Sequence, residues 1–238
     1  MDNTVYTTLN RQSGLMQEMQ VVANNIANLS TTGFRKEGVI FAEHVAALDG
    51  GEPPLSMASA EGRVINRTQG TLQQTGGPLD LAIEGQGYFQ IATPDGNQLT
   101  RAGDFTRSPD GELVTVDGFS VLDSGGSPIA VPADAGPVTI AKDGTISASG
   151  NAIGQVGLFE PADANDLVHA GGTRFKTAGD VEPVENGTLF QGFLENSNVN
   201  PVSEITRMIE VQRAYEMGQG FLDAEDGRIR SVVQTLGR

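Results

Sequence analysis

Apolar side chains recur at helical spacing near the start of the chain. Residues 15–32 contain neither glycine nor proline, and their apolar positions follow a 4-3-4-3 spacing. These positions are Leu15, Met19, Val22, Ile26 and Leu29. Such spacing is typical of the contact face of a helix that packs as in a coiled coil. The pattern therefore predicts a long N-terminal helix that ends near Gly33, where glycine suits a left-handed C-cap.

A second amphipathic helix is predicted at the other end of the chain. Asn200 and Pro201 form a start signal, because asparagine favours the N-cap and proline the first helical position. A helix from there to residue 236 would be about 54 Å long. Its apolar positions on one 3-4 register are Ile205, Met208, Tyr215, Leu222, Ile229, Val233 and Leu236. The same register also passes through Gln212, Gln219 and Asp226, so the predicted face is not apolar throughout.

Three glycines, Gly218, Gly220 and Gly227, lie inside this predicted helix, and each interior glycine costs about 0.5–1 kcal/mol relative to alanine. The run Met217–Gly220 therefore predicts a local kink or looser packing. Because of these glycines and the polar positions, we expect both terminal helices to be marginal alone and to gain order against neighbours. An ordinary antiparallel helix pair packed on the rest of the chain is the alternative.

The middle of the chain changes to short apolar runs and period two. Asp-Gly dipeptides at residues 95, 110, 117 and 143 favour tight turns, and the runs between them are typical of strands. The clearest predicted strands are residues 79–83, 87–91, 112–116 and 138–140. No regular element is predicted for residues 34–75. The middle is therefore expected to be an all-β body of short hairpins.

The predicted fold class is α+β, with long N- and C-terminal helices pairing as a coiled-coil-like domain and a central all-β domain of short hairpins. The expected parts are a terminal helical assembly domain at residues 1–33 and 198–238, an extended connecting segment at 34–75, and the central β domain at 76–197.

Composition narrows the possible functions of the 238-residue chain. Thirty acidic against 15 basic residues, a net charge of −15, disfavour nucleic acid and anionic lipid as partners. The chain has no cysteine and only two histidines, His44 and His169, so disulfides, thiol catalysis, histidine triads and the common zinc sites are poorly supplied. No run approaches the roughly 18 apolar residues of a membrane span. The start, Met1–Thr4, lacks the pattern of a cleaved secretory signal, so ordinary secretion is not expected.

Three short motifs have the composition of a catalytic or metal-binding site. Gly85-Gln86-Gly87 has Gln90 at the third glycine position and leads into a predicted strand, which favours a tight bend over a dinucleotide loop. Asp123-Ser124-Gly125 is half of an aspartic-protease motif, and the chain has no second half. The acidic group Asp223, Glu225 and Asp226 favours a solvated helix face over a calcium site. We therefore expect no enzyme activity, no cofactor, no metal site and no small-molecule substrate.

Several segments, in chain order, carry a resemblance to a known family. They are residues 22–35, 79–89, 100–122, 194–200 and 208–216. Together they resemble the bacterial flagellar rod and hook proteins over nearly the whole chain. The residues that carry the motif at the two ends are Asn24, Asn25, Asn28, Thr32, Gly33, Phe34, Asn196, Ser197, Asn198, Val199, Arg213, Tyr215 and Glu216.

This resemblance implies a structural subunit whose terminal helices form an inner tube with the β domain outside. Hook proteins are longer, so a rod component is favoured, the proximal-rod paralogue first and the distal-rod paralogue as the alternative. The implied partners are copies of itself, other flagellar rod proteins and the flagellar export apparatus. The implied location is the basal-body rod where it crosses the periplasm, reached by export without a cleaved signal peptide. The twelve apolar helix positions given above are then the expected assembly interface. A β-rich surface adhesin or binding module is the alternative of another class.

Overall fold

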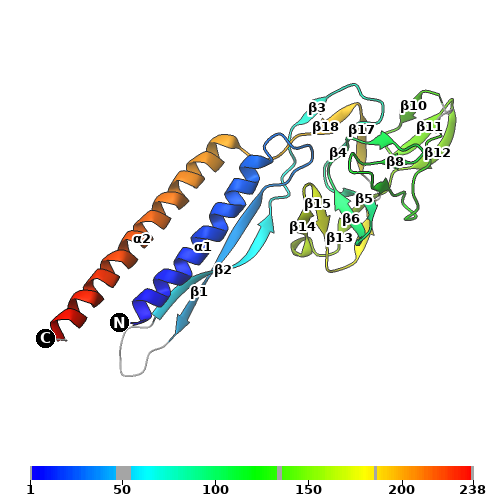
Figure 1. Cartoon of the computed structure of the whole chain (residues 1–238). Helices are drawn as coiled ribbons and strands as arrows, with labels where there is room; N and C mark the ends of the chain where they lie inside the picture. The colour runs from blue at the N-terminus through cyan, green and yellow to red at the C-terminus, as the bar shows by residue number, and fades with distance from the viewer. Residues whose placement is uncertain (1, 47–54, 133–135, 185–186, 237–238) are drawn as a thin grey trace. The chain divides into compact units, whose positions relative to one another are not determined.

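The computed structural model describes residues 2–46, 55–132, 136–184 and 187–236. Within these ranges the chain has two α-helices, one short 3-10 helix and eighteen strands (Figure 1). It divides into two compact units. The first, here called the helix–hairpin unit, comprises Met1–Ala27, Glu37–Val64 and Asn200–Arg238. The second, here called the β unit, comprises Asn28–Lys36 and Ile65–Val199.

The helix–hairpin unit holds both long helices and two strands. Its elements are α1 (Asp2–Ala27), β1 (Glu37–Ala46), β2 (Leu55–Ile65) and α2 (Pro201–Leu236). α1 packs against α2 and against β1, and β1 pairs with β2 (Figure 1). The side chain of Asn200 caps α2, because its Oδ1 accepts hydrogen bonds from the N–H groups of Val202 and Ser203 at 3.0 and 3.1 Å. The predicted start signal of the C-terminal helix is confirmed.

The predicted fold class is wrong. The terminal helices do pair, but the unit that contains them also includes a two-stranded sheet, and strands supply most of the elements of the chain. The segment 34–75, expected to be an extended connector, contains β1, β2 and β3 (Leu72–Gln74). Alanine, serine and glycine occupy five of the eleven positions of β2, whereas β1 contains the apolar run Val39-Ile40-Phe41. Neither strand has a clear period-two pattern, so the hairpin gives little sequence signal.

The β unit is built from short strands. Besides β3 they are β4 (Leu81–Glu84), β5 (Tyr88–Thr93), β6 (Gly96–Thr100), β7 (Thr106–Arg107), β8 (Leu113–Val114), β9 (Ser120–Val121), β10 (Val138–Ile140), β11 (Thr145–Ala148), β12 (Asn151–Gln155), β13 (Leu158–Pro161), β14 (Val168–Gly171), β15 (Arg174–Lys176), β16 (Val181–Pro183), β17 (Thr188–Gln191) and β18 (Phe193–Glu195). A 3-10 turn, η1, covers Ala164–Asp166. The four strands that the sequence marked most clearly are confirmed as β4, β5, β8 and β10.

A nine-stranded antiparallel sheet forms most of the β unit. Its main order is β14-β15-β6-β5-β9-β8-β7, and β13 joins it by pairing with both β5 and β16. β10, β11 and β12 form a separate sheet. The last two strands return to the first ones, because β17 pairs with β4 and β18 pairs with β3. This return brings residues near 195 beside residues near 72.

The turns follow the predicted Asp-Gly dipeptides. Gly96, Gly111, Gly118 and Gly144 all have φ between 82° and 103°, the left-handed region that glycine enters without a steric penalty. Strands joined by such turns can pack their alternate side chains into one interior. The main core cluster is made by Leu81, Ile83, Phe89, Ile91, Phe105, Leu113, Val121, Ile129, Val131, Ile140, Ile146, Val156, Leu158 and Leu189.

Candidate assembly interface

The buried face of α2 is one register position away from the predicted one. Its buried side chains are Glu204 and Val211, and the half-buried positions between and after them continue the same 4-3 spacing. This stripe is Glu204, Met208, Val211, Tyr215, Gly218, Leu222 and Glu225. It shares Met208, Tyr215 and Leu222 with the predicted register. It replaces the predicted positions 205, 212, 219 and 226 by 204, 211, 218 and 225, where Glu204 and Gly218 give no apolar signal.

The twelve predicted interface residues therefore fall into two groups. Eight of them are partly or fully buried: Leu15, Met19, Val22, Ile26, Leu29, Met208, Tyr215 and Leu222. Exposed are Ile205, Ile229, Val233 and Leu236. Five other apolar side chains of α2 are also exposed: Val202, Ile209, Met217, Phe221 and Val232. In a single chain, α2 thus presents a large number of apolar side chains to solvent.

Asn25 connects three elements of the helix–hairpin unit. Its side chain is fully buried. It donates to the backbone oxygen of Glu37 at 2.9 Å and to Oε2 of Glu204 at 3.0 Å, and it accepts from the N–H of Glu37 at 2.9 Å. These bonds join the end of α1 to the start of β1 and to the first turn of α2. A buried amide with its hydrogen bonds satisfied specifies this geometry more strictly than an apolar side chain would.

Two further polar contacts hold α1 against α2. Nε of Arg207 donates to Oε1 of Glu18 at 2.6 Å. Farther along, Nε2 of Gln12 donates to the backbone oxygen of Tyr215 at 2.9 Å. A Cβ atom at Gly218 would lie 2.4 Å from this Nε2, so the glycine gives the Gln12 side chain the room it occupies. α2 is one continuous helix through Met217–Gly220, and Gly218 serves packing there.

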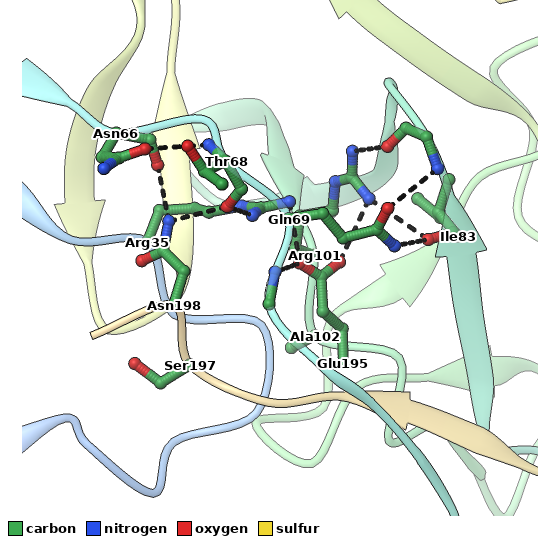
Figure 2. A network of polar contacts seen from close by, with 12 residues as sticks. Arg35, Asn66, Thr68, Gln69, Ile83, Arg101, Ala102, Glu195, Ser197 and Asn198 are labelled. Carbon is green, nitrogen blue, oxygen red and sulfur yellow. Dashed lines mark hydrogen bonds and ion pairs between the residues drawn. The ribbon is translucent and has the colours of Figure 1, made fainter. Parts of the chain in front are cut away.

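In the β unit, the motifs from the two ends of the chain lie side by side (Figure 2). Gly33 has φ +69°, and its N–H donates to the backbone oxygen of Glu195 at 2.7 Å. The side chain of Asn198 accepts from the N–H of Lys36 at 2.7 Å. It also donates to the backbone oxygens of Asn66 and Thr68 at 2.9 and 2.8 Å. These bonds fix where the chain leaves the β unit near residues 36 and 199.

A buried ion cluster lies beside these motifs (Figure 2). Nη2 of Arg35 is 2.8 Å from Oε1 of Glu195, and Nη1 of Arg101 is 3.1 Å from Oε2 of the same carboxylate. The three side chains are only 1–3% exposed. Burial lowers the pKa of both guanidinium groups, and Glu195 opposes that shift. Arginine stays protonated in proteins, so the cluster holds two positive charges against one negative charge.

The remaining motif residues serve different roles. Phe34 is buried and stacks on the ring of His169 with centroids 5.3 Å apart. Oγ1 of Thr31 donates to Oδ1 of Asn28 at 3.1 Å. Thr32 and Ser197 are half-buried and Val199 is buried, whereas Asn24, Asn196, Arg213 and Glu216 are exposed. The structure thus brings the motif residues on either side of Gly33 and Asn198 together, whereas in the middle of α2 Tyr215 is half-buried and Arg213 and Glu216 are on the surface.

The sequence analysis did not single out Arg35, Arg101, Glu195 or Glu204. Arg35, Arg101 and Glu195 lie within the segments that carry the family resemblance, which was the available signal. No sequence pattern shows that these three charged residues meet, because 66 positions separate the first from the second and 94 the second from the third. Glu204 was missed because an acidic residue in the first turn of a helix is ordinarily a solvated one.

Within the described ranges, no helix is long and apolar enough to cross a membrane. Among the same residues, no group of three or more histidine, cysteine or acidic side chains is arranged to hold a metal ion.

Known proteins are similar to this chain over its whole length. Family models described as flagella basal body rod protein, flagellar hook protein FlgE/F/G D1 domain and flagellar basal body rod FlgEFG protein C-terminal match residues 6–35, 82–148 and 191–235. A flagellar basal-body rod protein FlgF of Caulobacter vibrioides is 41% identical over 244 residues, covering 100% of this chain and 99% of the relative. The chain belongs to the flagellar basal-body rod protein family.

Two further relatives show how this family divides. The flagellar basal-body rod protein FlgF of Mesorhizobium japonicum is 35% identical and covers 100% of this chain and 99% of its own. The flagellar basal-body rod protein FlgG of Bacillus subtilis is 34% identical and covers 97% of both chains. This rod protein is therefore of the FlgF type and a structural component of the flagellar basal body. These matches do not support the alternative of a surface adhesin or binding module.

Proposed function

We propose that this rod protein polymerises through its terminal helices into the axial shaft, as the proximal-rod paralogue. One observation carries the proposal: α2 exposes many large apolar side chains, whereas the β unit buries its own core. The apolar side chains of α2 are the surface that neighbouring subunits would cover. The FlgF relatives support the proximal paralogue. Similarity to FlgG proteins keeps the distal paralogue as a second candidate.

The exposed and buried helix positions would then have separate tasks. Val22, Met208, Tyr215 and Leu222 hold α1 and α2 together within one subunit. Ile205, Ile229, Val233 and Leu236 pack between subunits. Full burial of a large apolar side chain contributes about 1.5–3 kcal/mol. For four such residues per interface, this gain exceeds the conformational entropy that their side chains lose when they become ordered. Contacts between different surfaces of identical subunits produce a helical tube when the rotation between subunits does not close into a ring.

The implied partners are copies of itself and the other rod proteins, with delivery by the flagellar export apparatus. The rod would cross the periplasm, and its chemistry would lie in interfaces rather than in catalysis. The two helices also have few buried apolar side chains, so they would gain order on assembly. Hydrogen exchange of free subunits tests this point. Slow exchange throughout residues 22–29 and 205–222 of the monomer would contradict it.

Substitution of the exposed apolar positions tests assembly. The double variant Ile229→Asp, Val233→Asp should keep the monomer folded but abolish polymer growth, measured by light scattering and electron microscopy of the purified protein. The matched control is Val116→Asp, which charges an exposed valine of the β unit. Normal polymers from the double variant would refute polymerisation through α2.

Gene replacement tests the paralogue. Strains that lack the proximal or the distal rod protein are complemented with this chain, and basal bodies are examined by electron microscopy. Rescue of rod growth in the proximal-rod strain only is expected. Rescue in the distal-rod strain only would favour the second candidate.

A further inference from the structure

A small cavity in the β unit lies beside the buried ion cluster. Its volume is about 140 Å³, and its lining includes Arg67, Gly87, Tyr88, Arg101 and Glu160. That volume has room for about four water molecules, each of which takes about 30 Å³ in the liquid. A carboxylate or another small oxyanion therefore fits it. All lining residues belong to the β unit, so the cavity is formed within one unit.

The charges around this cavity are unbalanced. Arg35 and Arg101 share the single carboxylate of Glu195, and all three are nearly fully buried. One positive charge of this cluster is left over, and a buried charge is costly unless it is compensated. Arg67 brings a further positive charge to the lining. Glu160 also lines the cavity, but it forms no ion pair with Arg67 or Arg101 within the described residues. On a chain of net charge −15 this is a local concentration of positive charge.

One buried hydrogen-bond donor of this lining is left without an acceptor. Among the described residues, Nε of Arg101 is buried and has no hydrogen-bond partner. Tyr88 is only 4% exposed, and its ring lies against the ring of Phe175 and 5.2 Å from the Arg101 guanidinium, measured to the ring centroid. Burial raises the pKa of Tyr88, so its hydroxyl keeps the proton and can donate it in a hydrogen bond. Buried donors without partners are uncommon in folded proteins and call for an acceptor.

We propose that this cavity binds one small oxyanion of the carboxylate class. Arg67 and Arg101 supply the charge, and Tyr88 supplies a neutral donor. The carboxylate can come from an Asp or Glu side chain of a second copy, because acidic residues outnumber basic ones two to one on each copy. A free anion such as phosphate offers the same chemistry. Binding to the monomer does not depend on assembly of the rod.

The test uses full-length monomer labelled with ¹⁵N on its arginines. Sodium acetate and sodium sulfate are titrated separately against sodium chloride at constant ionic strength. A saturable shift of the Arg101 Nε–H signal is expected with acetate or sulfate and not with chloride. Arg67 is exposed, so Arg67→Gln should keep the fold and weaken binding about tenfold, whereas Glu160→Gln should strengthen it. Arg174→Gln, which removes an arginine elsewhere in the β unit, is the control. A shift that does not saturate, or equal affinity in Arg67→Gln and wild type, overturns the site.

A second measurement identifies the source of the anion. Self-association is followed by sedimentation velocity with and without sulfate. If a second copy supplies the carboxylate, both sulfate and Arg67→Gln reduce association. If the site takes a free anion, association is the same in Arg67→Gln and wild type while sulfate still binds. A chain that never associates contradicts the proposed rod assembly and leaves the monomer titration standing as the test of the site.

Discussion

The β unit and the helix–hairpin unit bury their apolar side chains to different extents. In the β unit, strands from distant parts of the chain enclose a continuous cluster in which Leu81, Phe89 and Ile91 are wholly buried. In the helix–hairpin unit, the buried apolar side chains among those the structure describes are Val21, Val22 and Val211. The β unit thus encloses an apolar core of its own, whereas the helix–hairpin unit leaves much of its apolar surface exposed to solvent.

The two units also use buried polar groups differently. In the β unit, Glu195 joins two arginines beside the segments by which the chain enters and leaves this unit. In the helix–hairpin unit, Asn25 and Gln12 tie α1 to its neighbours through neutral amides, and the one ion pair described above between α1 and α2, Arg207–Glu18, is half exposed at the arginine. A charged cluster that is buried this completely can be broken only at a high cost, whereas a lost amide bond costs less. The stability of the β unit should therefore be the more sensitive to single substitutions among its buried polar residues.

The largest expected effect is that of Glu195→Ala. Removing this carboxylate leaves Arg35 and Arg101 buried without their counter-charge, which should lower the free energy of unfolding of the β unit by about 3–5 kcal/mol. Urea unfolding followed by near-ultraviolet circular dichroism measures it. The control is Asp95→Asn, which breaks the pair with Lys176 at a carboxylate that is 73% exposed and should cost less than about 1 kcal/mol. Similar losses in the two variants would show that the cluster contributes little.

The next effect compares apolar side chains of the two units. Leu81→Ala should destabilise the monomer by about 3 kcal/mol, because it leaves a cavity in a closed core. Leu236→Ala should change the monomer by less than about 0.5 kcal/mol, because Leu236 is 82% exposed, but it should weaken polymer formation. Equilibrium unfolding and light scattering give the two quantities. A strongly destabilised Leu236→Ala monomer would mean that α2 packs its apolar face within one subunit.

The same contrast explains what the sequence could predict. The strands around Leu81, Phe89 and Val138 and the turns at the Asp-Gly dipeptides follow from local pattern, because period two and left-handed glycine are local properties. The existence of both long helices also follows from spacing and from the cap at Asn200. The buried face of α2 does not, because Glu204 and Gly218 occupy it while apolar residues such as Leu236 face solvent. Apolar residues that a subunit exposes and apolar residues that it buries look the same in the sequence of a single chain.

Local sequence patterns could not predict the ion cluster or the β1–β2 hairpin, for reasons that differ from the one that applies to α2. Arg35, Arg101 and Glu195 meet because β18 returns to β3, and such a return is set by the whole topology. β2 is rich in alanine, serine and glycine, which carry little strand preference, and the apolar run of β1 at residues 39–41 shows no alternation. Their partner is the face of α1 near Gly14, where a Cβ would lie 2.9 Å from the ring of Phe41.

A smaller effect is expected for the amide that joins α1, β1 and α2. Asn25→Ala leaves the N–H and the backbone oxygen of Glu37 and one oxygen of Glu204 without this partner. The loss should be about 1–3 kcal/mol in the stability of the helix–hairpin unit. Helical circular dichroism during urea unfolding measures it. Asn24→Ala, at the exposed neighbouring position, is the control and should change stability by less than about 0.5 kcal/mol. Equal effects of the two substitutions would contradict the role of Asn25.

The smallest effect separates the two glycines near the middle of α2. Around Gly220 there is no atom within 4 Å of an added Cβ, so Gly220→Ala should stabilise the helix by about 0.5–1 kcal/mol. Gly218→Ala has the same gain in helix propensity, but its Cβ displaces the end of Gln12 and removes the bond to Tyr215, worth about 1 kcal/mol. The two terms cancel, so its net effect should be near zero.

The variant Gln12→Ala separates these two terms. In that background Gly218→Ala no longer meets the amide, so it should stabilise α2 as much as Gly220→Ala does, measured by helical circular dichroism during urea unfolding. Equal stabilisation by Gly218→Ala and Gly220→Ala in the wild-type background would instead mean that the Gln12 side chain moves away at no cost. The contact between α1 and α2 would then depend less on its amide bonds than on Val22 and Val211, and the helix–hairpin unit would resemble the β unit in the way it is held together.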